Sequence, residues 1–159
     1  MDTIRESGVV RLSQQGPTSA LNYETEQVGM PGAHEVLIRQ EAIALNFVDV
    51  LFRNGNFPLR QLPATIGVEA AGVIEAVGIA VNDWVIGDRV GYYFSLGACA
   101  ERRLIDQRQL VKLPDDITFD QAASLLAKGL TARMLVKQAY PIQPGDIVLV
   151  HAVCSSEVS

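Results

Sequence analysis

The sequence predicts a β-rich α+β protein, in which a body of short strands is followed by a pair of helices and then by one more strand. Three observations support this fold class. Short apolar segments separated by glycine and proline turns extend to Pro114, a helix-start signal follows at Thr118, and an unbroken apolar run occupies Ile147–Val150. Frequent turns between strands this short favour a small barrel or sandwich for the body.

The strand-like segments begin with "EVLIRQEAIALN" at residues 35–46, which alternates apolar and polar positions after a Pro-Gly turn. The next, "GVEAAGVIEAVG" at residues 67–78, carries three glycines that would each cost a helix about 1 kcal/mol relative to alanine. In a bent strand such glycines indicate bulges or close backbone approach. Three further short strands are expected within residues 87–94, 98–105 and 109–114.

The pattern becomes helical after Asp115. Thr118 is a candidate N-cap with Gln121 three residues on, which is the spacing of a capping box. Gly129 is expected to break this first helix, and a second helix is expected to begin near Leu130 or Thr131 and to end before Pro141. The first helix places four apolar residues on one face, Phe119, Ala122, Ala123 and Leu126.

The run Ile147–Val150 follows a Pro-Gly-Asp turn and reads as a strand buried on both faces, as in a parallel α/β sheet. A β-rich domain followed by helices and such a strand is the opening of a two-domain architecture. We therefore divide the chain into a domain at residues 1–115 and connecting helices plus the first strand of an incomplete second domain at residues 116–159.

Composition excludes several classes of function. The 159 residues are 48% hydrophobic and 19% charged with a net charge of −5, and no cluster of Lys or Arg indicates a nucleic-acid surface. No apolar run approaches the ~20 residues that span a bilayer, and the N-terminus lacks the layout of a signal peptide. A cytoplasmic protein is expected. The two cysteines, Cys99 and Cys154, read as structural thiols.

Four stretches together resemble one family: "ALNFVDVLFRNGNFP" (44–58), "LPATIGVEAAGVIEAVG" (62–78), "GDRV" (87–90) and "AASLLAKGLTARMLV" (122–136). They are similar to the medium-chain dehydrogenase/reductase superfamily, and within it to the zinc-free quinone oxidoreductases related to zeta-crystallin. The resemblance implies a GroES-like catalytic barrel at the N-terminal side, followed by a dinucleotide-binding Rossmann domain that this chain only begins.

The same resemblance leads to an expectation about zinc binding. Zinc-dependent relatives carry Cys-x-x-Asp where this chain has Asn46 and Asp49, and Gly-His-Glu where it has Gly67, Val68 and Glu69. Neither a carboxamide nor an isopropyl group replaces a thiolate or an imidazole as a zinc ligand. No metal is therefore expected, and Glu69 is expected to make a structural ion pair or backbone contact.

Without a metal, the chemistry that the resemblance implies is hydride transfer from NADPH to a quinone or enone. The nicotinamide end of the cofactor is then expected along Asn46, Phe47, Val48, Asp49, Val50 and Leu51, with Thr131 approaching from the start of the second helix and with Phe57 and Met134 in the substrate pocket. From their types alone, Asn46 and Thr131 also suit a strand end and a helix start. Close relatives have tyrosines at the positions of Leu51 and Phe57, so phenol contacts are not expected there.

The final residues of the chain differ from the sequence pattern of the family. Residues 152–159 contain no glycine, whereas relatives have a glycine-rich turn that closes on the cofactor pyrophosphate. Weak or no NADPH binding is expected for this chain alone. His34 is expected to be exposed, and structural hydrogen bonding is the expectation for both His34 and His151.

Two functions stay open at this point. The first is the catalytic part of an NADPH-dependent quinone or enone reductase, inactive by itself. The second is a non-enzymatic binding module, which forms a homodimer through the exposed terminal strand. A zinc alcohol dehydrogenase is a third and weaker reading, because Asn46 and Val68 replace two ligands.

Overall fold

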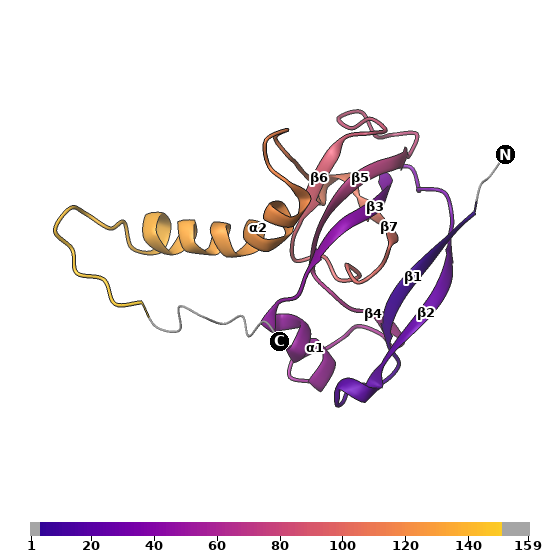
Figure 1. The fold of residues 1–159 in the computed structure, drawn as a ribbon, viewed down its shortest axis with the longest axis horizontal. Coiled ribbons are helices and arrows are strands. Elements are labelled where there is room, and N and C mark those ends of the chain that lie inside the picture. Colours follow the sequence, from indigo (N-terminus) through magenta and orange to yellow (C-terminus); the bar gives the residue numbers. More distant parts are fainter. Residues whose placement is uncertain (1–3, 151–159) are drawn as a thin grey trace.

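The structure is a computed structural model that describes residues 4–150, and it consists of two antiparallel sheets with two α-helices (Figure 1). The three-stranded sheet has the order β2-β1-β4, and the five-stranded sheet has the order β7-β3-β5-β6-β8. The strands are β1 (Arg5–Leu12), β2 (Leu21–Val28), β3 (Glu35–Ala44), β4 (Ala64–Thr65), β5 (Glu69–Val77), β6 (Arg89–Tyr92), β7 (Arg102–Asp106) and β8 (Val111–Lys112). The helices are α1 (Phe47–Asn54) and α2 (Phe119–Met134), with short turns η1 (Thr18–Ala20), η2 (Gln107–Gln109) and η3 (Leu135–Ala139).

The predicted β-rich body is confirmed, and its core lies inside the five-stranded sheet. Inward side chains of β3, β5 and β6 alternate with outward ones and bury an apolar cluster. The cluster consists of Val36, Ile38, Ala70, Ile74, Val90, Tyr92, Ala98, Ile105 and Leu110. Val9 of β1 forms a bridge to Ala100, which joins the two sheets.

Glycine within β5 serves the close backbone approach that the sequence predicted. The register of β3 against β5 shifts between Gln40 and Ala42, opposite Gly72. A Cβ atom at Gly72 would lie 2.1 Å from the carbonyl oxygen of Arg39, closer than any real contact. Only glycine therefore lets these two strands meet at this point.

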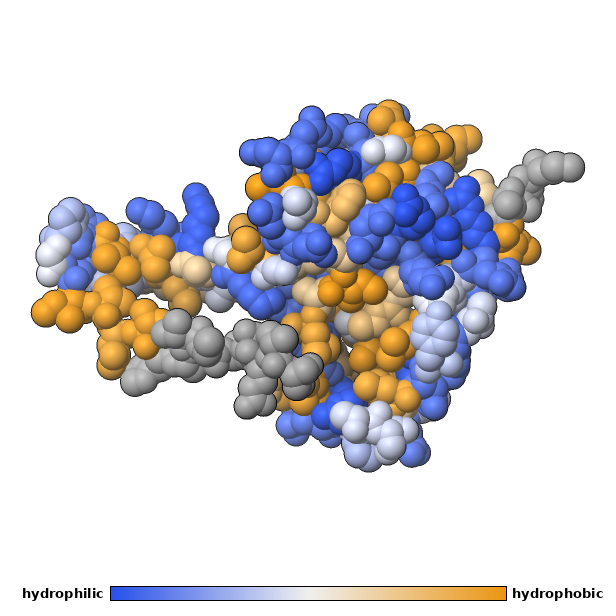
Figure 2. Space-filling view, viewed as in Figure 1, coloured by the Kyte–Doolittle hydropathy of each residue, from blue (hydrophilic) through white to orange (hydrophobic). Residues whose placement is uncertain are grey.

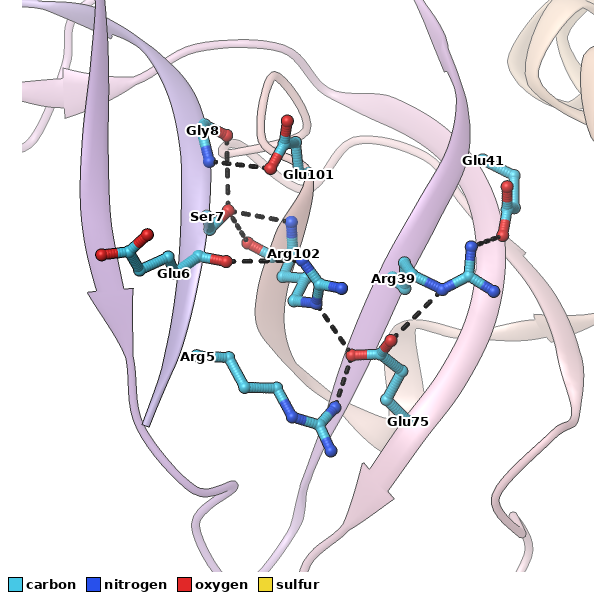
Figure 3. Close-up of polar contacts among 9 residues, drawn as sticks. All are labelled: Arg5, Glu6, Ser7, Gly8, Arg39, Glu41, Glu75, Glu101 and Arg102. Atoms are coloured by element: carbon cyan, nitrogen blue, oxygen red, sulfur yellow. Dashed lines mark hydrogen bonds and ion pairs between the residues drawn. The ribbon is translucent and has the colours of Figure 1, made fainter. Parts of the chain in front are cut away.

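An ionic cluster on the outer face of the body links four strands (Figure 3). Glu75 of β5 accepts from Arg102 of β7 at 3.0 Å and from Arg5 of β1 at 2.5 Å, and Arg39 of β3 lies 3.2 Å from its other oxygen. Ser7 adds a further link, because its hydroxyl donates to the Arg102 carbonyl and accepts from the Arg102 N–H. The N–H of the neighbouring Gly8 donates to the Glu101 carboxylate. Strands distant in sequence are thereby tied together outside the apolar core.

Helix α2 begins as predicted and continues further than predicted. The Gln121 N–H donates to the Thr118 hydroxyl at 3.2 Å, and the Thr118 N–H donates to the Gln121 side chain at 3.0 Å. Ala122 and Ala123 are buried against Ala71 and Leu113, so the first turns dock on the body, and the rest extends away from it (Figure 1).

The predicted break at Gly129 is wrong, because α2 runs through it to Met134 and passes directly into the π-helical turn η3. The two predicted helices are therefore one helix. A single glycine costs a helix only about 1 kcal/mol, and the good helix formers on either side outweigh that cost. It follows that Thr131 lies inside a helix and not at the start of one.

The predicted strand at Ile147–Val150 is also wrong. These residues form no strand, and the side chain of Ile147 is fully exposed. A strand needs hydrogen bonds from a neighbour, and nothing in the described part of this chain provides them. The outer end of α2 and the segment that follows it consequently present a hydrophobic surface (Figure 2).

Residues 151–159, with His151, Cys154 and the glycine-free end, lie outside the described residues. In the part that the structure does describe, no helix is long and apolar enough to cross a membrane. The division of the chain at residue 115 remains a prediction.

Candidate active site

The candidate site is a groove between the β body and α2, which we name the α2 groove. It has a volume of about 420 Å³. The body side is formed by the start of α1, by Val68 just before β5 and by Phe94 in the loop after β6. The residues that line it are Asn46, Phe47, Val48, Val68, Phe94, Ala127, Lys128, Thr131, Ala132 and Leu135.

Asn46 is fixed in place from three directions. Its backbone N–H donates to the Asp49 carboxylate at 2.8 Å, which begins α1 in the manner of a helix cap. Its side-chain NH₂ donates to Glu69 at 2.9 Å, and its side-chain oxygen accepts from Lys128 at 3.1 Å. Both ends of the carboxamide are therefore engaged, and its orientation is set by the protein itself.

Glu69 is the buried anchor of this arrangement. Its side chain has no solvent exposure, one oxygen accepts the Asn46 amide, and the other accepts the Ala127 N–H of α2 at 2.7 Å. Lys128 lies 3.7 Å from the first of these oxygens. The structural role expected for Glu69 is confirmed, and its contacts join β5, α1 and α2.

Asp49 lies behind the groove and is almost fully buried. One of its oxygens accepts from Asn46, and the other has no hydrogen-bond donor among the described residues. Burial raises the pKa of the Asp49 carboxyl, the Asn46 N–H opposes that rise, and the nearby Glu69 adds to it. Asp49 thus positions α1 and does not line the groove.

The structure brings together only some of the residues predicted for the site. Asn46, Phe47, Val48 and Thr131 line the α2 groove. Other predicted residues lie elsewhere, namely Asp49, Val50, Leu51, Phe57 and Met134.

Four of these placements have a clear physical reason. Helix α1, which the sequence analysis did not identify, turns the side chains of Val50 and Leu51 away from the groove. Phe57 follows α1 and packs edge-to-face on Phe52, with ring centroids 5.7 Å apart. Because α2 is continuous, Leu135 faces the groove in place of Met134.

Thr131 contributes differently from the expectation. Its hydroxyl donates to the Ala127 carbonyl one turn earlier at 2.8 Å, as threonine commonly does inside a helix. At a helix start its backbone N–H would be free to bind a ligand, but inside α2 it is not. The hydroxyl oxygen keeps its lone pairs for a ligand in the groove.

Lys128 and Phe94 line the groove and were not identified from the sequence. Phe94 has a positive φ of 56°, which is uncommon for a residue other than glycine, and it is largely exposed. Lys128 reads in the sequence as an ordinary polar helix residue. Its proximity to Asn46, 82 positions away, is visible only in three dimensions.

Neither Cys99 nor His34 belongs to the site. Cys99 is a free, half-buried thiol, and burial together with the charge of Asp49 raises its pKa to about 11, so it is not a thiolate at neutral pH. His34 is exposed, as expected. Within residues 4–150, no three His, Cys, Asp or Glu side chains lie close enough together to hold a metal ion.

Comparison with known proteins gives a consistent picture. The family model of the alcohol dehydrogenase GroES-like domain matches residues 32–116. A quinone oxidoreductase of Pseudomonas aeruginosa is 41% identical over 144 residues, which are 90% of this chain and 44% of that protein. A 2-haloacrylate reductase of a Burkholderia species is 38% identical over 147 residues, 89% of this chain and 44% of that protein.

Solved structures agree with these relatives. A quinone oxidoreductase of Pseudomonas syringae superposes with a TM-score of 0.85 at 40% identity, covering 88% of this chain and 43% of that one. The Escherichia coli quinone oxidoreductase complexed with NADPH superposes with a TM-score of 0.84 at 33% identity, covering 86% and 42%. The chain spans less than half the length of these relatives. It belongs to the alcohol dehydrogenase GroES-like domain family and, within the medium-chain dehydrogenase/reductase superfamily, corresponds to the N-terminal portion of the quinone oxidoreductases.

Proposed function

We propose that this chain is the catalytic-domain part of a reductase that transfers hydride from NADPH to a quinone or another conjugated carbonyl. The observation that carries the proposal is the α2 groove, which is apolar except for Asn46 on the body side and Lys128 and Thr131 on α2. Sites for small ligands commonly combine apolar walls with a few fixed polar groups. Relatives named for quinone and haloacrylate reduction, and one solved with NADPH, support the reaction class.

The residues fit the nicotinamide end of NADPH. A flat, largely apolar ring with one carboxamide suits the walls formed by Val48, Val68 and Ala132. Thr131 and the fixed Asn46 would hold its polar substituents. When bound, the cofactor supplies the hydride, and the protein orients the two reactants and excludes water between them.

We propose that the reaction needs no zinc. Asn46 and Val68 carry side chains that zinc does not accept as ligands. In addition, the Lys128 ammonium already lies against Asn46 and close to Glu69, and a second cation there would be repelled. Metal analysis of the purified chain checks this part of the proposal.

The test is a titration of the ¹⁵N-labelled chain with reduced nicotinamide mononucleotide, followed by NMR. We expect roughly millimolar binding, because a ligand of this size gains only a few kcal/mol. Shifts should gather at Val48, Val68 and Thr131. Ala132→Phe should fill the groove and abolish them, while Leu125→Phe, on an exposed part of α2 outside the groove, should not. Shifts that survive Ala132→Phe would contradict the proposal.

Turnover is tested in a chimeric protein. Joining the second half of the Pseudomonas aeruginosa quinone oxidoreductase after Val150 should give NADPH oxidation in the presence of quinones. The chain alone should give none, since NADPH binding by itself is expected to be weak or absent. A well-folded chimera without turnover would count against the reductase. The cytoplasmic location likewise remains a prediction.

A non-enzymatic binding module is the second candidate. The observation that favours it is the exposed apolar segment Ile147–Val150, which continues the hydrophobic outer end of α2. Self-association through this segment is the corresponding expectation, and sedimentation velocity tests it.

A further inference from the structure

We propose that the ammonium group of Lys128 is the electrophile of the site. It would stabilise the negative charge that develops on the carbonyl oxygen of the acceptor. This inference rests on the proposed reductase function and assigns a catalytic residue to it. It arises from the position of Lys128, which lies against Asn46, the residue that replaces a zinc-ligating cysteine of metal-dependent relatives.

The protein holds this ammonium in a defined place. Its Nζ donates to the Asn46 side-chain oxygen at 3.1 Å and lies 3.7 Å from a carboxylate oxygen of Glu69. Asn46 is itself held by Glu69 and Asp49, so the contact point for the ammonium does not move freely. A lysine ammonium has three donors, and these two contacts leave at least one for a ligand.

Pairing with Glu69 does not use every donor of this ammonium. Both oxygens of Glu69 already accept hydrogen bonds, from Asn46 and from the Ala127 N–H, and Lys128 offsets the charge of Glu69 from 3.7 Å without donating a hydrogen bond to it. Among the residues that line the α2 groove in the described structure, Lys128 alone carries a charge. Its side chain is 52% exposed, so the ammonium is accessible to a ligand.

The chemistry of the reaction needs a positive charge at this point. A hydride enters the β-carbon of the conjugated carbonyl, its two electrons displace the π electrons toward oxygen, and an enolate forms. Water would then give a proton to the α-carbon and leave hydroxide, and NADPH, when bound, would supply the hydride with its two electrons. A fixed ammonium beside the carbonyl oxygen lowers the barrier, because its charge interacts more strongly with the developing oxyanion than with the neutral carbonyl.

The test uses the chain as it is, with p-nitrophenol as the probe, because its neutral and anionic forms differ in visible absorbance. If Lys128 holds an oxyanion, the chain should bind the phenolate about tenfold more tightly than the phenol, which lowers the pKa of the bound probe by about one unit. Lys128→Met should abolish this preference while the neutral phenol still binds. Lys128→Arg should retain it.

Lys112→Met is the matched control, because Lys112 also pairs with a carboxylate, at 3.1 Å from Asp88, and lies outside the groove. It should leave the preference unchanged. An unchanged preference in Lys128→Met would overturn the inference, as would a chain that binds neither form. If the nicotinamide titration fails while the phenolate preference is observed, the proposed reductase function is disproved and the oxyanion site at Lys128 stands. The two proposals can therefore be disproved independently.

Discussion

The side-chain amide of Asn46 donates a hydrogen bond of 2.9 Å to Glu69, a carboxylate without solvent exposure. The second oxygen of Glu69 accepts from the backbone of α2, so a single side chain holds the start of α1 and the middle of α2 on the β body. The geometry of the α2 groove depends on this carboxylate, which leads to the first prediction.

Glu69→Gln should destabilise the chain by about 2–3 kcal/mol, because its NH₂ group must face one of two donors and leaves that donor unsatisfied. Urea unfolding followed by circular dichroism measures the change. Glu6→Gln, at an exposed position of β1, is the control and should stay within about 0.5 kcal/mol of the wild type. Equal effects of both substitutions would show that Glu69 does not anchor the groove.

Gly129→Ala should stabilise the chain by about 1 kcal/mol. The position is inside α2, and a Cβ atom there would have no neighbour within 4 Å, so the substitution gains helix propensity without a clash. Thermal unfolding provides the measurement. Gly72→Ala is the opposite case, because its Cβ would collide with the Arg39 carbonyl, and it should unfold the body or lower its stability by several kcal/mol.

A destabilised Gly129→Ala would mean that α2 does break at this glycine, as its sequence suggests. The pair therefore tests the helix continuity on which the placement of Thr131 and Leu135 depends.

From β3 onward the β body was largely predictable from the sequence, because its signals are local, whereas β1 and β2 were not identified. The turns and small residues around β5 indicate strand bends, and the Thr118–Gln121 pair indicates the start of α2. The eight residues of α1 were missed, since Val48 and Val50 within them favour strands and the helix is stabilised by contacts of Asn46 and Asp49.

The site was less predictable, because it is made by tertiary contacts. Asn46 and Glu69 could be singled out by resemblance, but Lys128 joins them only through the docking of α2. Thr131 was assigned to a helix start because a glycine precedes it by two positions. The cost of one helical glycine is small compared with the burial of Ala122 and Ala123 that holds the helix in place.

Glu75→Gln should lower stability by about 1–2 kcal/mol at pH 7, with a smaller effect in acid. Burial pushes the pKa of Glu75 upward, but hydrogen bonds and charges from Arg102 and Arg5 outweigh it, and the pKa lies below its ordinary value of 4.5 (Figure 3). Because the carboxyl binds its proton less readily in the folded chain, its stabilisation is present above pH 4.5 and is lost as the pH falls toward the folded value.

Urea unfolding of wild type and Glu75→Gln at several pH values measures this difference. The two curves should converge below pH 4.5. Glu24→Gln, at a more exposed carboxylate that pairs with Arg11 alone among residues 4–150, should have less than half the effect at pH 7. A difference between wild type and Glu75→Gln that does not change with pH would contradict the role of the charge.

The chain should self-associate at high concentration through residues 147–150 and the outer end of α2. Ile147 and Leu149 expose 101% and 77% of their surface, and the preceding end of α2 with η3 exposes further apolar side chains, namely Met134, Leu135, Val136 and Tyr140. An apolar surface of this kind lowers its free energy when a second copy covers it. Sedimentation velocity over a range of concentrations measures the association.

Val148→Ser with Val150→Ser should weaken it at least tenfold without changing the circular dichroism spectrum, because both side chains are exposed and support no part of the core. Ile79→Ser removes an equally exposed isoleucine from a separate loop and should leave association unchanged. A chain that stays monomeric at all concentrations would remove the main support for the binding module and leave the reductase as the sole proposal.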